Sequence, residues 1–265
     1  MARNTYGLDL GSYEIKVYDK KQDTIWKEKN VLAVQDKKEI IAIGEDAYQM
    51  YEKTPPDIEV AFPMRDGVIS HFNDMQNLLQ NILKKNRHFS RGAEYVIAVP
   101  TDVTEVQKKA FFDLVIHSNA KAREVNIVER SIADAVGLGI DVQNTTGVMI
   151  INFGGETTEL SVLTEGGIVF NRLLKLGGTT LDQEIVNLVR NSHDFLIGSR
   201  TAEILRQQFD VFNGDSETAF SVAGRDLITG LPMRKTISIT LVRAAFKDTL
   251  LECMKAGRSM LDRTP

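Results

Sequence analysis

Apolar and polar residues follow two periods along the chain, one typical of strands and the other of helices. Residues 5–19 predict two short strands around a turn at Gly11-Ser12, and residues 31–44 predict a second hairpin that turns through 36–38. Within 71–85, apolar residues recur at spacings of three and four, so this segment predicts an amphipathic helix. Strands therefore come first in the chain and a helix follows them.

The central part predicts an alternating order of strands and helices. The runs at 95–100 and 125–128 are almost entirely apolar, which predicts strands buried on both faces. Helices are expected at 104–117 and 131–139, and a shorter one at 46–53 before a pair of prolines. Strand, helix, strand, helix in this order indicates a parallel sheet with crossover connections.

A second unit begins near residue 147, and its first elements resemble the start of the chain. The stretch at 147–178 predicts three strands joined by glycine turns. "GLDLGS" at 7–12 and "IINFGG" at 150–155 form a weak internal repeat, because each is a strand that runs into a glycine turn. The remaining elements are expected to be helices at 180–190, 201–209 and 240–261, with strands at 219–224 and 235–240.

Composition narrows the class of protein. The chain has 265 residues, of which 43% are apolar and 26% charged, as is usual for a globular protein. Its formal charge of −4 provides no bulk attraction to nucleic acid or anionic lipid, so no nucleic-acid partner is expected. The single cysteine, Cys253, excludes a disulfide within the chain and is expected to pack in the core. We find neither a signal peptide nor an apolar run long enough for a transmembrane helix.

The two glycine turns are candidates for binding an anion. Glycine lets consecutive backbone N–H groups point at a phosphate, and Gly11-Ser12 and Gly154-Gly155 both suit this geometry. Hydroxyl groups at Ser12, Thr157 and Thr158 could add donors. Each turn taken alone is more easily interpreted as an ordinary hairpin, and it is the repeated pair that favours a phosphate site. Asp9 lies beside the first turn, either as a magnesium ligand or as a solvated aspartate.

Several segments in series resemble the MreB family of bacterial actin homologues, within the actin and sugar-kinase superfamily. "YGLDLGS" is similar to the family's first phosphate loop, and "INFGGETTELSVLTEGGIV" to its second. The resemblance covers essentially the whole chain. Further matching segments are "MRDGVISHF", "VIAVPTDVTEVQKKA", "AREVNIVERSIADAVGLG", "KLGGTTLDQEIVNLVR", "LIGSRTAEILRQQF" and "VAGRDLITGLPMRKTISI".

The resemblance implies an α/β actin-like (ribonuclease H-like) fold of two lobes, with ATP and magnesium in the cleft between them. The last part of that fold, including the adenine-contacting glycine segment, is expected to lie beyond Pro265. Each lobe would have a core and a small subdomain. Residues 1–31 and 66–142 would form the first core with 32–65 as its subdomain, and residues 143–182 and 236–265 the second core with 183–235 as its subdomain.

The resemblance also implies roles for particular residues. The predicted phosphate-binding residues are Gly11, Ser12 and Tyr13 in the first loop and Gly154, Gly155, Thr157 and Thr158 in the second. The predicted nucleoside contacts are Gly177, Gly178, Glu203 and Arg206. Asp9 and, through a water molecule, Asn152 are the predicted magnesium positions.

Four residues depart from the family pattern in these segments. The family's second loop reads Asp-x-Gly-Gly-Gly-Thr-Thr, whereas this chain has Asn152 for the aspartate and Glu156 for the third glycine. The family's Glu-Glu-Pro is replaced by Glu129-Arg130-Ser131, so an arginine stands where a carboxylate activates water. Since arginine cannot act as a general base near neutral pH, we expect weak hydrolysis, with Glu129 and Arg130 as the nearest catalytic candidates. Arg130 could instead pair with the γ-phosphate.

The family further implies a homopolymer filament at the cytoplasmic face of the inner membrane. Its partners would be other MreB paralogues and membrane-bound proteins of cell-wall elongation. A non-catalytic paralogue that joins or regulates such filaments remains an alternative, and another ATPase of the superfamily or a sugar kinase is a more distant one. Phe89, surrounded by Lys84, Lys85, Arg87 and Arg91, is the candidate membrane contact, and the alternative is a solvated basic loop.

Replacing Phe89 tests this membrane contact. Phe89→Ser should lower the fraction of protein that sediments with anionic liposomes, because it removes the inserted aromatic ring and keeps the basic residues. Phe112→Ser on the predicted helix at 104–117 is the matched control. Equal sedimentation of Phe89→Ser and the parent protein would rule out insertion.

Overall fold

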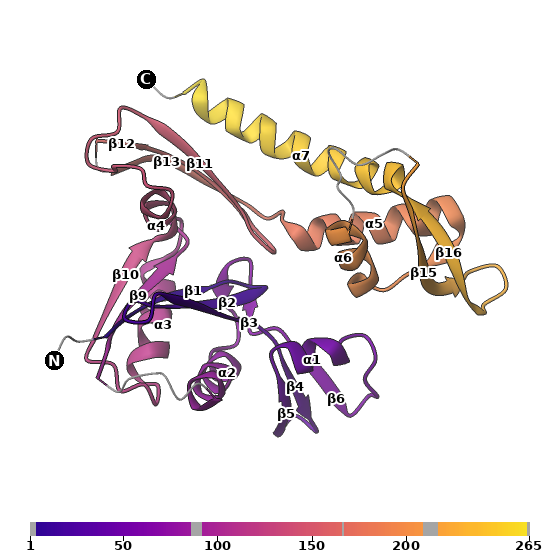
Figure 1. Cartoon of the computed structure of the whole chain (residues 1–265), viewed down its shortest axis with the longest axis horizontal. Helices are drawn as coiled ribbons and strands as arrows, with labels where there is room; N and C mark the ends of the chain where they lie inside the picture. The colour runs from indigo at the N-terminus through magenta and orange to yellow at the C-terminus, as the bar shows by residue number, and fades with distance from the viewer. Residues whose placement is uncertain (1–3, 86–91, 166, 209–216, 264–265) are drawn as a thin grey trace. The chain divides into compact units, whose positions relative to one another are not determined.

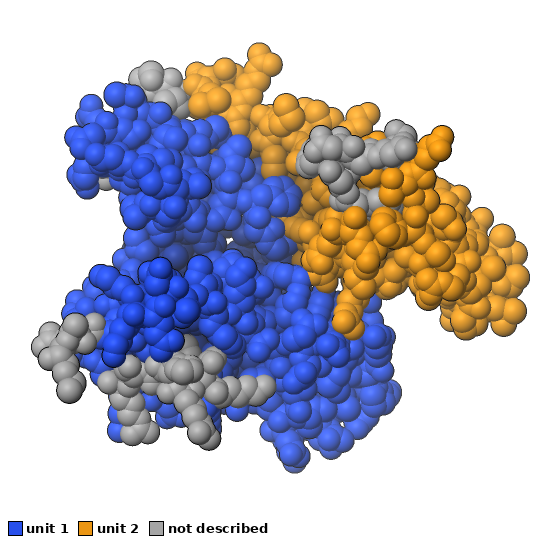
Figure 2. Space-filling model, in the orientation of Figure 1, with its two compact units in different colours: residues 1–175 blue, residues 176–265 orange. Residues whose placement is uncertain are grey.

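The computed structural model describes residues 4–85, 92–165, 167–208 and 217–263. Compactness divides the chain into unit 1, Met1–Lys175, and unit 2, Leu176–Pro265. Figure 1 labels the elements and Figure 2 colours the two units. Each unit is described by itself, and the four-part division expected from the family stays a prediction.

A five-stranded mixed sheet forms the centre of unit 1 (Figure 1). Its order is β10-β9-β1-β2-β3, with β1 parallel to β9, β9 parallel to β10, and antiparallel pairing from β1 through β2 to β3. Helix α3 (Glu105–Ile116) connects β9 to β10 as the predicted crossover. The strands are β1 (Thr5–Leu10), β2 (Glu14–Asp19), β3 (Thr24–Lys29), β9 (Glu94–Val99) and β10 (Glu124–Glu129).

Helix α2 (Phe72–Lys85) confirms the strongest periodic signal in the sequence. Its apolar residues at three- and four-residue spacing pack into the core of unit 1, where Met75, Leu78 and Ile82 are almost fully buried. At about 25 cal/mol per Å² of apolar area removed from water, each such side chain stabilises the fold by roughly 1.5–3 kcal/mol.

Two expectations for the main sheet were wrong. The strand at β9 is buried on alternate residues rather than on both faces, and β10 is an edge strand whose Glu124 and Asn126 are exposed. The third strand of the antiparallel part, β3, was not predicted. Its sequence "TIWKEK" is rich in charge because β3 is the opposite edge of the sheet.

A small sheet of three strands and one helix lies next in the chain. Strands β4 (Leu32–Gln35), β5 (Glu39–Ile43) and β6 (Ile58–Ala61) pair in the order β5-β4-β6, and helix α1 (Glu45–Met50) follows β5. The β4–β5 hairpin confirms the prediction for 31–44, with positive φ at Asp36 and Lys37 in its turn. Helix α1 ends at Met50, before the prolines that were expected to stop it.

A short hairpin and a second three-stranded sheet complete unit 1. Strands β7 (Met64–Arg65) and β8 (Val68–Ile69) form the hairpin. Helix α4 (Arg130–Gly137) follows β10 directly and contacts β9, β10, β11 and β13, so it joins the main sheet to the second one. That sheet has the predicted three antiparallel strands, β11 (Val148–Phe153), β12 (Thr158–Thr164) and β13 (Gly167–Leu174).

The described residues of unit 2 form three helices and a small sheet of order β14-β15-β16. Cys253 of α7 is buried, as expected. Among the described residues, no helix is long and apolar enough to span a membrane. The elements are α5 (Gly178–His193), β14 (Phe195–Leu196), α6 (Ser199–Gln208), β15 (Ala219–Asp226), β16 (Pro232–Ser238) and α7 (Ile239–Leu261).

Asp226 stabilises the β15–β16 turn and gives a pH-dependent prediction. The N–H of Thr229, 2.8 Å from Oδ1, and the ammonium of Lys235, 2.9 Å from Oδ2, hold the pKa of Asp226 well below its ordinary value. A depressed pKa contributes stability that is present above the unfolded value of 3.8 and is lost as the pH falls further.

Asp226→Asn should therefore lower the urea midpoint of unfolding at pH 7, and the difference from the parent should shrink at pH values below 3.8. Asp248→Asn on the exposed face of α7 is the control and should leave the midpoint unchanged. A difference that is the same at both pH values would contradict the assignment.

Candidate functional site

The two predicted phosphate turns are closed by the same backbone hydrogen bond. In the first glycine turn (residues 11–14), the N–H of Gly11 donates to the carbonyl of Glu14 at 3.1 Å. In the second glycine turn (residues 154–157), the N–H of Gly154 donates to the carbonyl of Thr157 at 2.8 Å. The last paired residues before each turn also correspond, because Leu10 faces Ile15 and Phe153 faces Thr158. The internal repeat in the sequence is therefore a repeat of structure.

Close contacts explain why these positions are glycine. A Cβ at Gly11 would lie 2.8 Å from the carbonyl of Glu14, and one at Gly154 would lie 2.9 Å from the carbonyl of Thr157. A Cβ at Gly155 would lie 2.6 Å from Cβ of Tyr13. The first two contacts close each turn on itself, and the third packs the two turns against one another.

The β7–β8 turn (residues 65–68) connects the two glycine turns. Asp66 and Gly67 both have positive φ, 51° and 80°, as a tight two-residue hairpin requires. The N–H of Gly67 donates to Oγ of Ser12 at 3.2 Å, which leaves the hydroxyl proton of Ser12 available to donate. The N–H of Asp66 donates to Oε2 of Glu156 at 2.8 Å.

Glu156, which stands in the second turn where the family has a third glycine, binds the β7–β8 turn. Besides Asp66, its carboxylate meets the guanidinium of Arg65 at 3.7 Å. Part of its negative charge is thereby balanced. The threonines that follow, Thr157 and Thr158, are both buried.

Asn30 holds the first glycine turn through two hydrogen bonds, and the sequence did not predict this role. It is fully buried, its side-chain amide donates to the carbonyl of Gly11 at 2.7 Å, and its backbone N–H donates to that of Tyr13 at 3.0 Å. A lone asparagine after a charged strand carries no sequence signal for this role.

Asp9 lies two residues before the first turn and is paired with two cations. The ammonium of Lys16, its cross-strand partner, is 3.0 Å from Oδ2. The guanidinium of Arg130, the first residue of α4, is 3.4 Å from Oδ1. The structure thus brings Asp9 and Arg130 together, and it adds Lys16, which sequence reasoning did not single out.

Asn152 occupies the corresponding position before the second turn and binds another aspartate. Its side-chain amide donates to Oδ2 of Asp134 on α4 at 2.6 Å. Burial raises the pKa of Asp134, while the hydrogen bond from Asn152 and the charge of Arg130 act in the opposite direction. No pattern in the sequence identifies Asp134 as a site residue, because it lies within a short helix of small residues.

Glu159 is the cross-strand partner of Asn152, as Lys16 is of Asp9. It is buried, and its Oε1 accepts from the N–H of Thr101 at 2.9 Å and from the hydroxyl of Ser131 at 3.1 Å. Helix α4 therefore touches both glycine hairpins, through Arg130 on one side and through Ser131 and Asp134 on the other.

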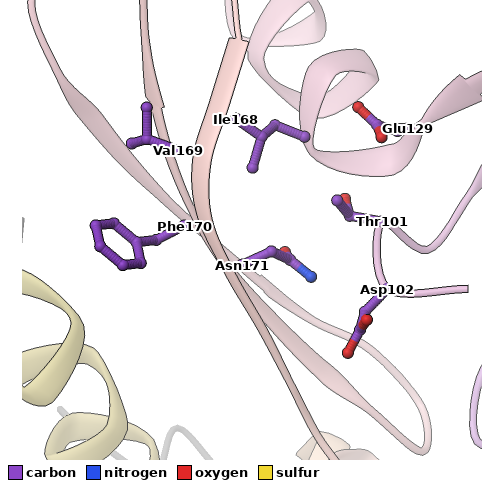
Figure 3. A pocket seen from close by; sticks show the side chains of 7 residues that line it. All are labelled: Thr101, Asp102, Glu129, Ile168, Val169, Phe170 and Asn171. Carbon is purple, nitrogen blue, oxygen red and sulfur yellow. The ribbon is translucent and has the colours of Figure 1, made fainter.

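Glu129 lines a different surface from Arg130. It borders a pocket of about 320 Å³ together with Thr101, Asp102 and residues 168–171 of β13. Figure 3 shows Ile168 and Asn171 on the side of β13 that faces Thr101, with Phe170 directed away. Glu129 and Arg130 are adjacent in the chain but have different neighbours: Glu129 borders this pocket, and Arg130 pairs with Asp9.

The predicted nucleoside residues all lie in unit 2. Gly177 and Gly178 begin α5, where the N–H of Gly177 donates to Oγ1 of Thr180 at 3.2 Å. Glu203 is buried on α6 and accepts from the side-chain amide of Gln207 at 2.9 Å.

Arg206 forms a two-pronged ion pair with Asp182 of α5, at 2.7 and 3.1 Å, which joins α6 to α5. The nucleoside roles of these residues stay predictions. Phe89 lies outside the described residues.

The residues that would hold magnesium fit it poorly. Magnesium needs hard oxygen ligands with free lone pairs, usually carboxylates. Both oxygens of Asp9 face cations, and Asn152 offers an amide whose nitrogen is bonded to Asp134. In the part of the chain that the structure describes, no group of three or more His, Cys, Asp or Glu side chains could hold a metal ion.

Comparison with known proteins identifies the family. A model of the MreB/Mbl protein family matches residues 3–265. The chain is 32% identical to the cell shape-determining protein MreB of Escherichia coli (strain K12), covering 100% of this chain and 78% of that protein. It is 30% identical to the cell shape-determining protein Mbl of Bacillus subtilis (strain 168), with 98% and 78% covered.

Solved structures agree with this. The crystal structure of MreB5 of Spiroplasma citri bound to ADP matches with a TM-score of 0.92 at 30% identity, covering 100% of this chain and 80% of that one. The double helical filament of MamK matches with a TM-score of 0.79 at 20% identity, covering 100% and 81%, which is a likeness of fold alone. The architecture is therefore the predicted actin-like α/β fold. The chain belongs to the MreB/Mbl family.

Adding a methyl group at Gly155 tests the packing of the two turns. Gly155→Ala should destabilise the fold by about 1–3 kcal/mol, because its Cβ would overlap that of Tyr13 and neither backbone can withdraw freely. Gly167→Ala is the control, since its Cβ would meet nothing within 4 Å. Urea unfolding of both variants measures the difference, and equal midpoints would show that the turns do not pack as described.

Proposed function

We propose that this protein binds ATP at the two glycine turns and assembles into a cytoskeletal filament that determines cell shape. The observation that carries the proposal is the pair of glycine turns in contact, each closed by the same hydrogen bond, because it brings two candidate phosphate loops to one region. Relatives named as cell shape-determining proteins, and MreB5 structures bound to AMPPNP and to ADP, support it.

Hydrolysis is weak in this proposal. A general base must accept a proton from the attacking water, and the guanidinium of Arg130 cannot do so near neutral pH. Its one side-chain hydrogen bond among the described residues is with Asp9, and its guanidinium places positive charge where the family has a carboxylate. Asn152 removes a second carboxylate. Arg130 would bind the γ-phosphate and keep ATP in place.

The same substitutions support an alternative, a non-catalytic paralogue that joins or regulates filaments of an active MreB. The two proposals share nucleotide binding and differ in whether this chain polymerises alone. Filament formation by the purified protein with ATP distinguishes them, because the paralogue needs a second MreB chain.

The proposed location is the cytoplasm, at the inner face of the cell membrane. The proposed partners are further copies of this chain, other MreB paralogues and membrane-bound proteins of cell-wall elongation. No nucleic-acid partner is proposed, because the formal charge of −4 gives no bulk attraction to phosphate backbones. Any magnesium would enter with the nucleotide, since the described residues contain no group of three or more His, Cys, Asp or Glu side chains that could hold it.

Phosphate release tests the weak hydrolysis. Turnover should be about 100–10,000-fold slower than that of Escherichia coli MreB under the same conditions, the range expected from losing a general base. A triple variant tests the cause. Asn152→Asp with Asp134→Asn exchanges the carboxylate and the amide of two hydrogen-bonded residues, and Arg130→Glu supplies the missing base. This variant should release phosphate at least about tenfold faster than the parent protein.

A matched exchange exists elsewhere in unit 1. Asn144 donates to Asp141 at 2.7 Å, so Asn144→Asp with Asp141→Asn and Arg123→Glu repeats the same chemistry away from the turns. This control should leave turnover unchanged. Turnover of the parent protein equal to that of Escherichia coli MreB would remove the proposal of weak hydrolysis.

A further inference from the structure

Arg130 is a buried cation with too few partners. Its side chain is only 11% exposed, yet its one side-chain hydrogen bond among the described residues is to Asp9, at the long distance of 3.4 Å. Its Nε is buried and has no hydrogen-bond partner in the described part of the chain. Burying a guanidinium costs free energy unless its donors are satisfied, so this environment is suited to a further anion.

Lys16 is the second cation of the same cluster, and it is open to solvent. Its side chain is 44% exposed, and the 3.0 Å contact with Asp9 uses one of its three donors. Cross-strand pairing fixes its place, because Lys16 lies directly opposite Asp9, two residues before the first glycine turn. The two cations thus approach one carboxylate from β2 and from α4, next to the proposed phosphate site.

This arrangement reproduces the charge of a divalent metal with fixed side chains. A magnesium ion at Asp9 would compete with Lys16 and Arg130 for the two carboxylate oxygens. Asn152 could not compensate for weaker binding by Asp9, because its amide carries no negative charge. Phosphate oxygens, in contrast, would gain the unused donors of both cations.

We propose that Lys16 and Arg130 together replace the divalent metal in binding the nucleotide phosphates, so that the protein binds ATP without requiring magnesium. The inference rests on the proposed nucleotide function. It concerns the ionic form of the ligand: free ATP carries more negative charge than its magnesium complex and therefore interacts more favourably with two fixed cations.

Calorimetric titration of the protein with ATP tests the inference, once with magnesium in excess and once with EDTA. The Kd in EDTA should be lower than the Kd in magnesium, or equal to it to within about threefold. Binding that is more than about tenfold weaker in EDTA would overturn the inference and leave the proposed function intact. Absence of binding in both buffers would overturn the two together.

Variants assign the effect to the two cations. Lys16→Met and Arg130→Gln should each weaken ATP binding in EDTA about tenfold or more, because each removes a charged donor. Lys109→Met is the control and should have no effect, since Lys109 pairs with Asp113 on its own helix. The two variants carry the test separately, so misfolding of one leaves the other. Unchanged affinity of a folded variant in EDTA would overturn the role of that cation.

Discussion

The contact between the two glycine turns is the constraint on which the rest of unit 1 depends. Gly155 approaches Tyr13 so closely that a single methyl group would overlap it, and no side chain can intervene between the hairpins. The β7–β8 turn then binds Ser12 from one hairpin and Glu156 from the other through successive N–H groups. Three separate parts of the chain meet there, because the backbone N–H groups of the β7–β8 turn bind one side chain from each glycine turn.

Helix α4 completes this arrangement from the opposite side. Its first residue pairs with Asp9, and Ser131 and Asp134 bind residues of the second hairpin. The helix begins immediately after the edge strand β10, so the main sheet fixes where these side chains start. Since α4 also contacts β11 and β13, the second sheet depends on the first for its position.

The sequence predicted regular elements well and side-chain partnerships poorly. Periodicity located α2, and the glycine-flanked strands located both hairpins, because these patterns are local. The edge strand β3 escaped because exposed, charged strands resemble loops. Four further residues were not identified from the sequence, because the role of each depends on a partner up to 58 residues away in the chain, as that of Glu159 depends on Thr101. They are Lys16, Asn30, Asp134 and Glu159. The resemblance supplied the predicted ligand positions, but it could not show that Asp9 is paired with Lys16 and Arg130.

Asn152, which stands where the family has an aspartate, donates a hydrogen bond to Asp134. The absence of a carboxylate at position 152 therefore has to be considered together with Asp134. At 2.6 Å, Asp134 needs a donor, and an ionised aspartate at position 152 has none to offer. Glu159, opposite position 152 across the hairpin, already requires donors from Thr101 and Ser131. A third carboxylate there would meet two others, with Arg130 already paired to Asp9. The amide at 152 and the acid at 134 are therefore one coupled feature of this chain, in which the negative charge lies on helix α4 and its hydrogen-bond donor on strand β11.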